Sequence, residues 1–227
     1  MVRPRVNLDY GYCVLSIDES EVYVGGIEPS RFIHQLSGRV QIFFLGGPRK
    51  LDVGTFSILV VDLETAINEG VEPFHVFDSD SKTAPYYGPL YLQRTWSGTD
   101  FRASVTRAVC GDESIWRPNL LILDRLAVYP EHRGQGVGLL AIRGLIERFR
   151  MGIGLIVMKP FPLQFESEPT SPKDVETRRR LGLDDFRMGY KPALAKLRSY
   201  YATLGFRCIP RTSLMGLAPE HYVPDLD

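Results

Sequence analysis

The chain has 227 residues, of which 44% are apolar, and its 27 Lys and Arg side chains balance 27 Asp and Glu side chains. This length and apolar content suit the core of one globular domain, so we predict a single domain over residues 1–227. A formal net charge of zero provides no general attraction to nucleic acids or anionic membranes, and we expect neither as a partner.

The cysteines and the absence of long apolar runs predict the compartment. Cys13, Cys110 and Cys208 are widely spaced and form no C-x-x-C pair, a pattern typical of reduced thiols inside a cell. This cysteine spacing predicts neither a disulfide framework nor a metal site. No apolar run approaches the ~20 residues of a membrane span, and no apolar signal segment follows the first residues. We therefore expect a cytoplasmic protein.

Residues 1–118 predict strands first and short helices later. Residues 12–17 and 21–24 have the pattern of a short pair of strands, and residues 40–45 and 56–61 predict two more. Asp62 is the predicted N-cap of a short helix that ends before Gly70.

Two further segments of this half are ambiguous. The acids and serines of residues 78–81 lack the pattern of a calcium loop and predict a solvated turn or a helix cap. The aromatic segment 86–91 is suited either to lining a pocket or to packing under the sheet.

Residues 120–138 join a predicted strand to a predicted helix through a glycine-rich turn. Residues 120–128 are almost continuously apolar. Residues 138–150 carry four apolar side chains at steps of three and four, which are Leu139, Ile142, Ile146 and Phe149. This pattern predicts an amphipathic helix, whose first N–H groups have no partner within the helix and can bind one anion together.

The glycines of this turn explain how an anion would reach it. Gly134, Gly136 and Gly138 have no β-carbon, so a pyrophosphate can approach the main chain closely, and Arg133 adds a charge nearby. The Rossmann pattern is excluded because its third glycine would fall at Leu139, and the Walker pattern because no Gly-Lys-Ser/Thr follows. An ordinary turn with helix-packing glycines is the alternative.

Residues 133–138, Arg-Gly-Gln-Gly-Val-Gly, resemble the Arg/Gln-x-x-Gly-x-Gly signature of the GNAT superfamily of N-acetyltransferases, with the family's Val-x-Pro entry at 128–130. The resemblance implies that acetyl-coenzyme A is the cosubstrate, with its pyrophosphate on the loop amides and its pantetheine arm on the preceding strand. The implied cofactor-binding residues are Leu126, Ala127, Val128, Arg133, Gly134, Gln135, Gly136, Val137 and Gly138.

Residues 200–206 are similar to the GNAT segment aromatic-Tyr-x-x-Leu-Gly-Phe. Gly205 suits the left-handed position that ends a helix, and residues 206–209 predict a strand after it. The resemblance implies that Tyr201 protonates the departing coenzyme A thiolate, since a phenol with a pKa near ~10 is protonated at neutral pH. Packing in a helical stripe of leucines is the other interpretation of Tyr201, and Tyr200 is predicted to pack.

Attack of an amine on a thioester needs a base and a partner for the carbonyl oxygen. By analogy with the family, main-chain N–H groups of residues 126–128 bind that oxygen. Asp124 stands four residues before Val128 and would share its face of a regular strand, so it is our candidate base, acting through water. An ion pair with Arg125 or another basic neighbour is the alternative, and a β-bulge would invert the face argument. Two weaker candidates have no predicted place beside the thioester, Glu113 and His75.

The resemblance implies the GNAT fold, an α/β fold with a mixed, mostly antiparallel central sheet flanked by helices. Residues 119–158 then carry the acetyl-coenzyme A motif, and residues 193–227 the C-terminal helix and strands. Residues 1–118 diverge, because the family usually places two helices between its first and second strands and the sequence does not show both.

Residues 159–192 are an insertion after the fifth predicted strand, 154–158. The stiff, apolar start of this insertion suggests a lid or a dimer arm, and residues 166–174 an exposed loop. The basic run 178–180 has acids close by, which favours a solvated helix face over a nucleic-acid or phosphate contact.

We therefore expect transfer of an acetyl group from acetyl-coenzyme A to a primary amine by direct attack, with a small molecule or a protein as acceptor. For the assembly, both a monomer and a homodimer stay open. The alternative from another class is a module that binds coenzyme A or acyl-coenzyme A as a sensor or structural ligand without turnover. The sequence does not name the amine.

Overall fold

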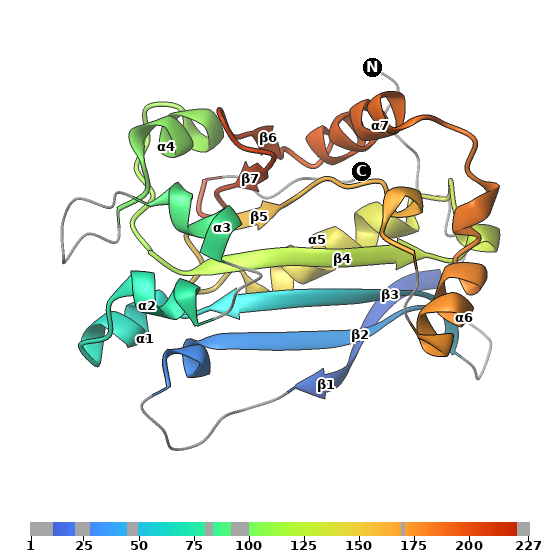
Figure 1. The fold of residues 1–227 in the computed structure, drawn as a ribbon, viewed down its shortest axis with the longest axis horizontal. Coiled ribbons are helices and arrows are strands. Elements are labelled where there is room, and N and C mark those ends of the chain that lie inside the picture. The colour runs from blue at the N-terminus through green and yellow to red at the C-terminus, as the bar shows by residue number, and fades with distance from the viewer. Residues whose placement is uncertain are drawn as a thin grey trace.

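The computed structural model describes residues 11–20, 28–44, 50–79, 84–91, 100–168 and 171–221. Seven strands form one sheet in the order β1-β2-β3-β4-β5-β7-β6 (Figure 1). The strands are β1 Gly11–Ser20, β2 Ile33–Phe44, β3 Lys50–Val61, β4 Leu120–Val128, β5 Leu155–Met158, β6 Arg207–Cys208 and β7 Met215–Leu217. Only β4 and β5 pair in parallel, so the predicted α/β class with a mixed, mostly antiparallel sheet is confirmed.

Seven helices flank the sheet in the described ranges. They are α1 Leu63–Asn68, α2 Pro73–Asp78, α3 Ala84–Tyr87, α4 Ala103–Cys110, α5 Val137–Phe149, α6 Pro172–Arg180 and α7 Tyr190–Ala202. Short 3-10 turns lie at Pro29–Phe32, Gly88–Leu90, Pro130–His132, Leu163–Phe165 and Leu183–Asp185. None of the helices in these ranges has the length and apolarity to cross a membrane.

The first three strands are longer than their sequence patterns predicted. Residues 40–44 and 56–61 are only the last parts of β2 and β3, whose earlier halves carry polar residues that weaken the apolar alternation. The predicted strand 21–24 lies outside the described residues. Asp62 caps α1 as predicted, because its carboxylate accepts a hydrogen bond of 3.0 Å from the Thr65 N–H.

The helices of the N-terminal half follow β3. Helices α1 to α4 all lie between β3 and β4, whereas the described residues between β1 and β2 contain only the turn Pro29–Phe32. The three antiparallel strands are thus built first, and the chain then makes a helical excursion before it returns as β4.

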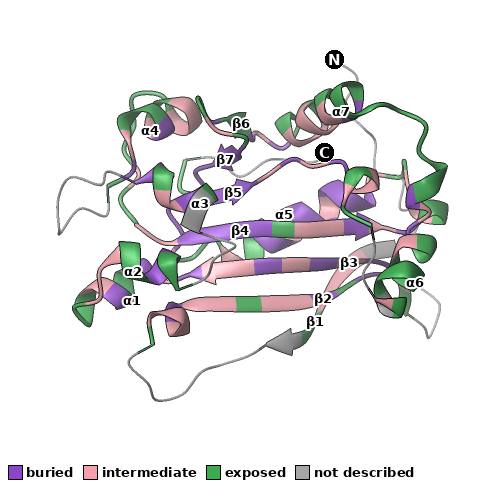
Figure 2. Cartoon of the chain, viewed as in Figure 1, coloured by how far each residue is buried: buried purple, intermediate pink, exposed green. Residues whose placement is uncertain are grey.

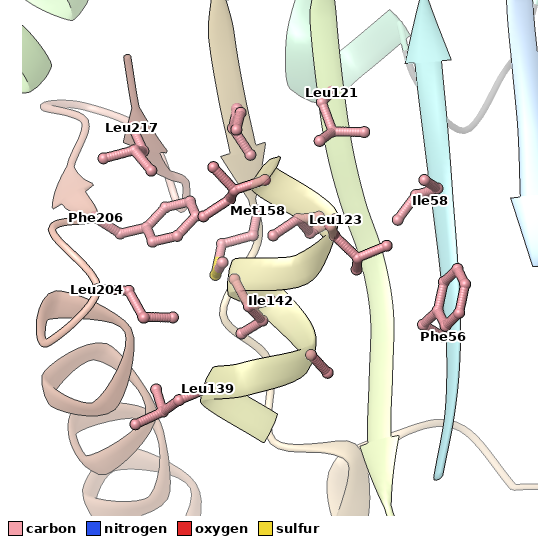
Figure 3. Packing of buried hydrophobic residues seen from close by; sticks show 14 of the residues in the cluster. Phe56, Ile58, Leu121, Leu123, Leu139, Ile142, Met158, Leu204, Phe206 and Leu217 are labelled. Atoms are coloured by element: carbon pink, nitrogen blue, oxygen red, sulfur yellow. The ribbon is translucent and has the colours of Figure 1, made fainter. Parts of the chain in front are cut away.

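Strand β4 runs through the middle of the sheet and packs on both of its faces. Leu121 and Leu123 join the core beneath α5, where they meet Ile142 of α5 and Phe206, which lies between α7 and β6 (Figure 3). Leu120 and Ile122 point to the opposite face of the sheet, where they join a second core with α1, α2 and α4. Side chains buried this completely each contribute about 1.5–3 kcal/mol, which fixes the position of β4. Figure 2 shows the contrast between the largely buried β4 and the largely exposed α6.

The C-terminal elements agree with prediction apart from their ends. Helix α7 begins three residues before the expected 193 and closes before Gly205, whose φ is +87°. Strand β6 is shorter than the predicted 206–209, because Phe206 and Ile209 turn into the two cores.

Candidate functional site

A cavity of about 870 Å³ opens where β4 continues beyond the end of β5. This volume lies within the 300–1,000 Å³ typical of small-ligand sites. Its walls come from β2, β3, β4, α3, the turn before α5, α5 itself, the segment after β5, and α7. The cavity therefore draws together segments from both halves of the chain.

The edge of β4 that faces this cavity is free of strand pairing within the described residues. β4 pairs with β5 only from Leu120 to Leu123, opposite Leu155 to Met158. Residues 124–128 have no strand on that side. The N–H and C=O groups that point to this edge are available to an extended ligand, except the Val128 carbonyl, which accepts from Arg133.

A β-bulge at Asp124 changes the face argument made from the sequence. Ser57 pairs with Arg125 whereas Ile58 pairs with Leu123, so Asp124 is the extra residue. Leu121 and Leu123 contact the α5 core before the bulge, and Leu126 and Val128 contact it after the bulge. The assumption of a regular strand was wrong. Asp124 nevertheless lies in the cavity wall.

The glycine turn places the first turn of α5 at the cavity. Gly134 and Gly136 have φ values of +77° and +79°, a region that side-chain-bearing residues rarely adopt. A Cβ on Gly134 would meet no protein atom within 4 Å, although this glycine lines the cavity. The space over the turn is thus open to a ligand.

Gly138 has a packing reason to be glycine in addition to the ligand approach that the sequence suggested. A Cβ there would lie 2.8 Å from the Tyr200 hydroxyl oxygen. Burial raises the pKa of Tyr200 to about 12, and the nearby Leu139 backbone opposes this increase. The Tyr200 side chain therefore packs directly against Gly138 at the start of α5.

Arg133 fastens the glycine turn to the segment after β5. Its Nε donates to the Val128 carbonyl at 2.9 Å, its Nη2 donates to the Leu181 carbonyl, and its guanidinium stacks over Phe186 at 4.8 Å. Arg133 still lines the cavity, but Gln135 does not and donates to the Glu131 carbonyl instead. The other residues predicted to bind the cofactor all line the cavity: Leu126, Ala127, Val128, Gly134, Gly136, Val137 and Gly138.

Tyr201 lines the same cavity from α7. Its ring packs against Tyr200 at a centroid distance of 5.6 Å and against the α5 core. Burial raises the pKa of Tyr201 to about 12, so the phenol remains protonated over the whole neutral range. The packing interpretation and the proton-donor interpretation of this residue are thus compatible.

Asp124 is exposed to the cavity and lies close to Tyr87 of α3. Burial, and after it the charge of Asp124, raise the pKa of Tyr87. The two weaker base candidates lie elsewhere, since His75 on α2 faces Glu72 and Glu113 pairs with His221. Among the described residues, no cluster of His, Cys, Asp or Glu has the composition of a metal site.

The segment 159–192 forms part of the cavity wall. Leu181 and Leu183 pack on Ala127 and Tyr129 at the end of β4, and Arg180 stacks over the Tyr129 ring at 4.2 Å. α6 accordingly lies beyond the arrowhead of β4 in Figure 1. The cavity wall also includes residues between Lys159 and Glu166. Glu166 therefore does not belong to the exposed loop expected at 166–174, whereas residues 167 and 168 are exposed. The first part of the segment is a packed wall.

The basic run 178–180 was expected to form a solvated helix face. The first two arginines agree with this expectation, because each pairs with a nearby acid. Arg178 pairs with Asp184 at 2.8 Å, and Arg179 pairs with Glu176 at the same distance.

Several cavity residues were not found by sequence reasoning. Arg125 forms two hydrogen bonds with Glu166, of 2.8 and 2.9 Å, across 41 residues of sequence. Lys159 places its Nζ 4.0 Å from the centre of the Tyr86 ring. No local pattern marks such long-range pairs, although the aromatic segment 86–91 did suggest a pocket wall.

Comparison with known proteins gives no relative for this chain, because no family model, no curated protein and no solved structure matches it.

Proposed function

We propose that this protein is an acetyl-coenzyme A-dependent N-acetyltransferase with a GNAT-type site that moves the acetyl group to a primary amine by direct attack. The observation that carries the proposal is one cavity that joins three features. These are the open glycine turn at the start of α5, the unpaired edge of β4, and a polar end that holds Asp124 near Tyr87.

The first two features suit the two halves of coenzyme A. The N–H groups of the α5 turn favour a pyrophosphate, and the helix dipole adds to that preference. The pantetheine arm carries two amides, which can hydrogen-bond to the free edge of residues 124–128 as an added strand does. This arrangement brings the thioester towards the point where β4 and β5 separate.

The chemistry of transfer then has a group for each step. The free amine attacks the thioester carbonyl, N–H groups of residues 126–128 receive the developing oxyanion, and the C–S bond breaks. Asp124 takes a proton from the acceptor through water, and Tyr201 gives its proton to the departing thiolate. The phenol of Tyr201 is protonated at neutral pH before the reaction, as a donor must be. Burial raises its pKa to about 12, which makes it a weaker acid than an exposed tyrosine.

Calorimetric titration with acetyl-coenzyme A, coenzyme A and NAD tests the first half of this proposal. We expect micromolar binding of both coenzyme A forms and none of NAD. A thiol-release assay with a panel of amines then tests the second half. Binding without thiol release would leave a coenzyme A-binding module and remove the transferase, and no binding would remove both.

A further inference from the structure

We propose that the acceptor is a zwitterionic amine, one that carries a carboxylate near its amino group as a free amino acid does. This inference rests on the proposed acyl transfer. It names the class of acceptor, which neither the glycine turn before α5 nor Tyr201 determines.

Four of the charged side chains that line the cavity, Asp124, Arg125, Lys159 and Glu166, come from the end of the β4–β5 pairing and the segment after β5, and two of these four cancel. The cavity wall also includes Arg133 and, from α7, Lys196. Arg125 and Glu166 face each other in a two-pronged ion pair with N···O distances of 2.8 and 2.9 Å. Such paired geometry uses both carboxylate oxygens, so neither residue offers a whole charge to a ligand. Asp124 and Lys159 remain.

Asp124 has no ion-pair partner among the residues that the structure describes. It is exposed in the cavity wall, and its one marked electrostatic effect is on the nearby Tyr87 phenol. The raised pKa of that phenol keeps it neutral, so it leaves the negative charge of Asp124 in place. An ammonium group of a ligand can therefore pair with this carboxylate before it is deprotonated for attack.

Lys159 likewise faces no carboxylate within ion-pair distance in the described part of the chain. It is half-buried, it lines the cavity, and its ammonium lies over the face of Tyr86. An aromatic face attracts and positions a cation, yet it leaves the full positive charge available to an anion on the other side.

The two unpaired charges lie at the same place in the fold. Leu123 of β4 pairs with Met158, the last residue of β5. Asp124 is the next residue of β4, and Lys159 directly follows β5. The aromatic rings beside them also touch, because Tyr86 and Tyr87 have centroids 6.3 Å apart. One small ligand with both charges can thus contact both residues while its amine lies near the thioester.

The same charges disfavour other amines. A polyamine would pair one ammonium with Asp124 and place a second cation near Lys159, where no further unpaired acid lies among the described cavity residues. A simple alkylamine would leave Lys159 without an anionic partner. A carboxylate close to the amine satisfies both residues, and this complementarity is the reason for the choice.

The test compares substrates that differ only at the carboxylate. Thiol release is measured with an amino acid, with the amide of that amino acid, and with 1,4-diaminobutane. We expect kcat/KM for the amino acid to exceed the value for the amide by roughly tenfold or more, since a charge-assisted contact is worth about that factor. The amide has the more easily deprotonated amine, so the comparison is biased against the proposal.

Variants then assign the preference to Lys159. Lys159→Gln should lower kcat/KM for the amino acid by roughly tenfold and hardly change the value for the amide. Lys191→Gln, an exposed lysine of α7 outside the cavity wall, is the matched control and should behave as the unchanged protein. Circular dichroism verifies folding, and the substrate comparison on the unchanged protein stands even if a variant does not fold.

Each outcome has one meaning. Equal kcat/KM for acid and amide, or an equal loss of both in Lys159→Gln, overturns the zwitterion proposal and leaves the transferase proposal intact. Acetyl-coenzyme A binding without turnover of any amine overturns both. A preference for the acid that disappears in Lys159→Gln supports both.

Discussion

The two ends of the cavity are built in different ways. The end that we assign to the cofactor is made largely of main chain from one continuous stretch, the β4 edge and the turn at Gly134 and Gly136. The acceptor end is made of side chains from separate segments, with Tyr86 and Tyr87 from α3 and Lys159 and Glu166 from beyond β5. A ligand held by main chain needs a local motif, whereas a ligand held by side chains needs the whole fold.

The segment after β5 connects these two ends. Through Leu181 it holds the guanidinium of Arg133 at the glycine turn, and through Glu166 it holds Arg125 at the acceptor end. Deleting or displacing this segment is therefore expected to alter both the cofactor end and the acceptor end of the cavity. Single substitutions, in contrast, should affect one end at a time.

The largest expected effect separates catalysis from cofactor binding. Tyr201→Phe removes the proposed proton donor and keeps the ring, so we expect kcat to fall by about a hundredfold while the Kd of acetyl-coenzyme A remains nearly unchanged. Steady-state kinetics and calorimetry measure the two quantities. Tyr190→Phe, on the exposed start of the same helix, is the control. A rate equal to that of the unchanged protein would return Tyr201 to packing alone.

A smaller effect should be confined to the cofactor end. Gly134→Val places a side chain in the open space over the turn and should raise the Kd of acetyl-coenzyme A at least about tenfold, or about 1.4 kcal/mol. Gly152→Val is the matched control, because Gly152 also has a positive φ, of +83°, with no neighbour within 4 Å and no place in the cavity wall.

Both glycine variants should lose about 1–2 kcal/mol of unfolding free energy from backbone strain, measured by chemical denaturation. Only the first should lose the cofactor. Equal Kd values in the two variants would show that the ligand does not lie over this turn.

The smallest effect should be confined to the acceptor end. Glu166→Gln breaks the pair with Arg125, whose side chains are 33% and 35% exposed, so the free energy of unfolding should fall by no more than about 1 kcal/mol. The KM for the acceptor should rise by no more than about fivefold because this wall loosens, with the Kd of acetyl-coenzyme A unchanged. Glu168→Gln, two residues further along, is the control. A large rise in the acetyl-coenzyme A Kd instead would mean that this ion pair supports the cofactor end.

The sequence by itself determined the elements whose patterns are local. The strand 120–128 and the following helix were predicted to within one residue, because burial on both faces gives β4 a continuous apolar run and a single buried face gives α5 its steps of three and four. The positive φ of Gly134, Gly136 and Gly205 likewise agrees with the turns that their positions predicted.

Only the tertiary structure decided what surrounds those elements. The bulge at Asp124 depends on how β4 pairs with β3, and the role of Gly138 depends on Tyr200, which arrives 62 residues later on α7. The acceptor end depends on contacts such as Arg125 with Glu166 that no spacing in the sequence encodes. Secondary structure and a main-chain ligand turn follow from short-range sterics and periodicity, whereas the pairing of distant side chains is fixed only when the cores on the two faces of the sheet bring their strands and helices together.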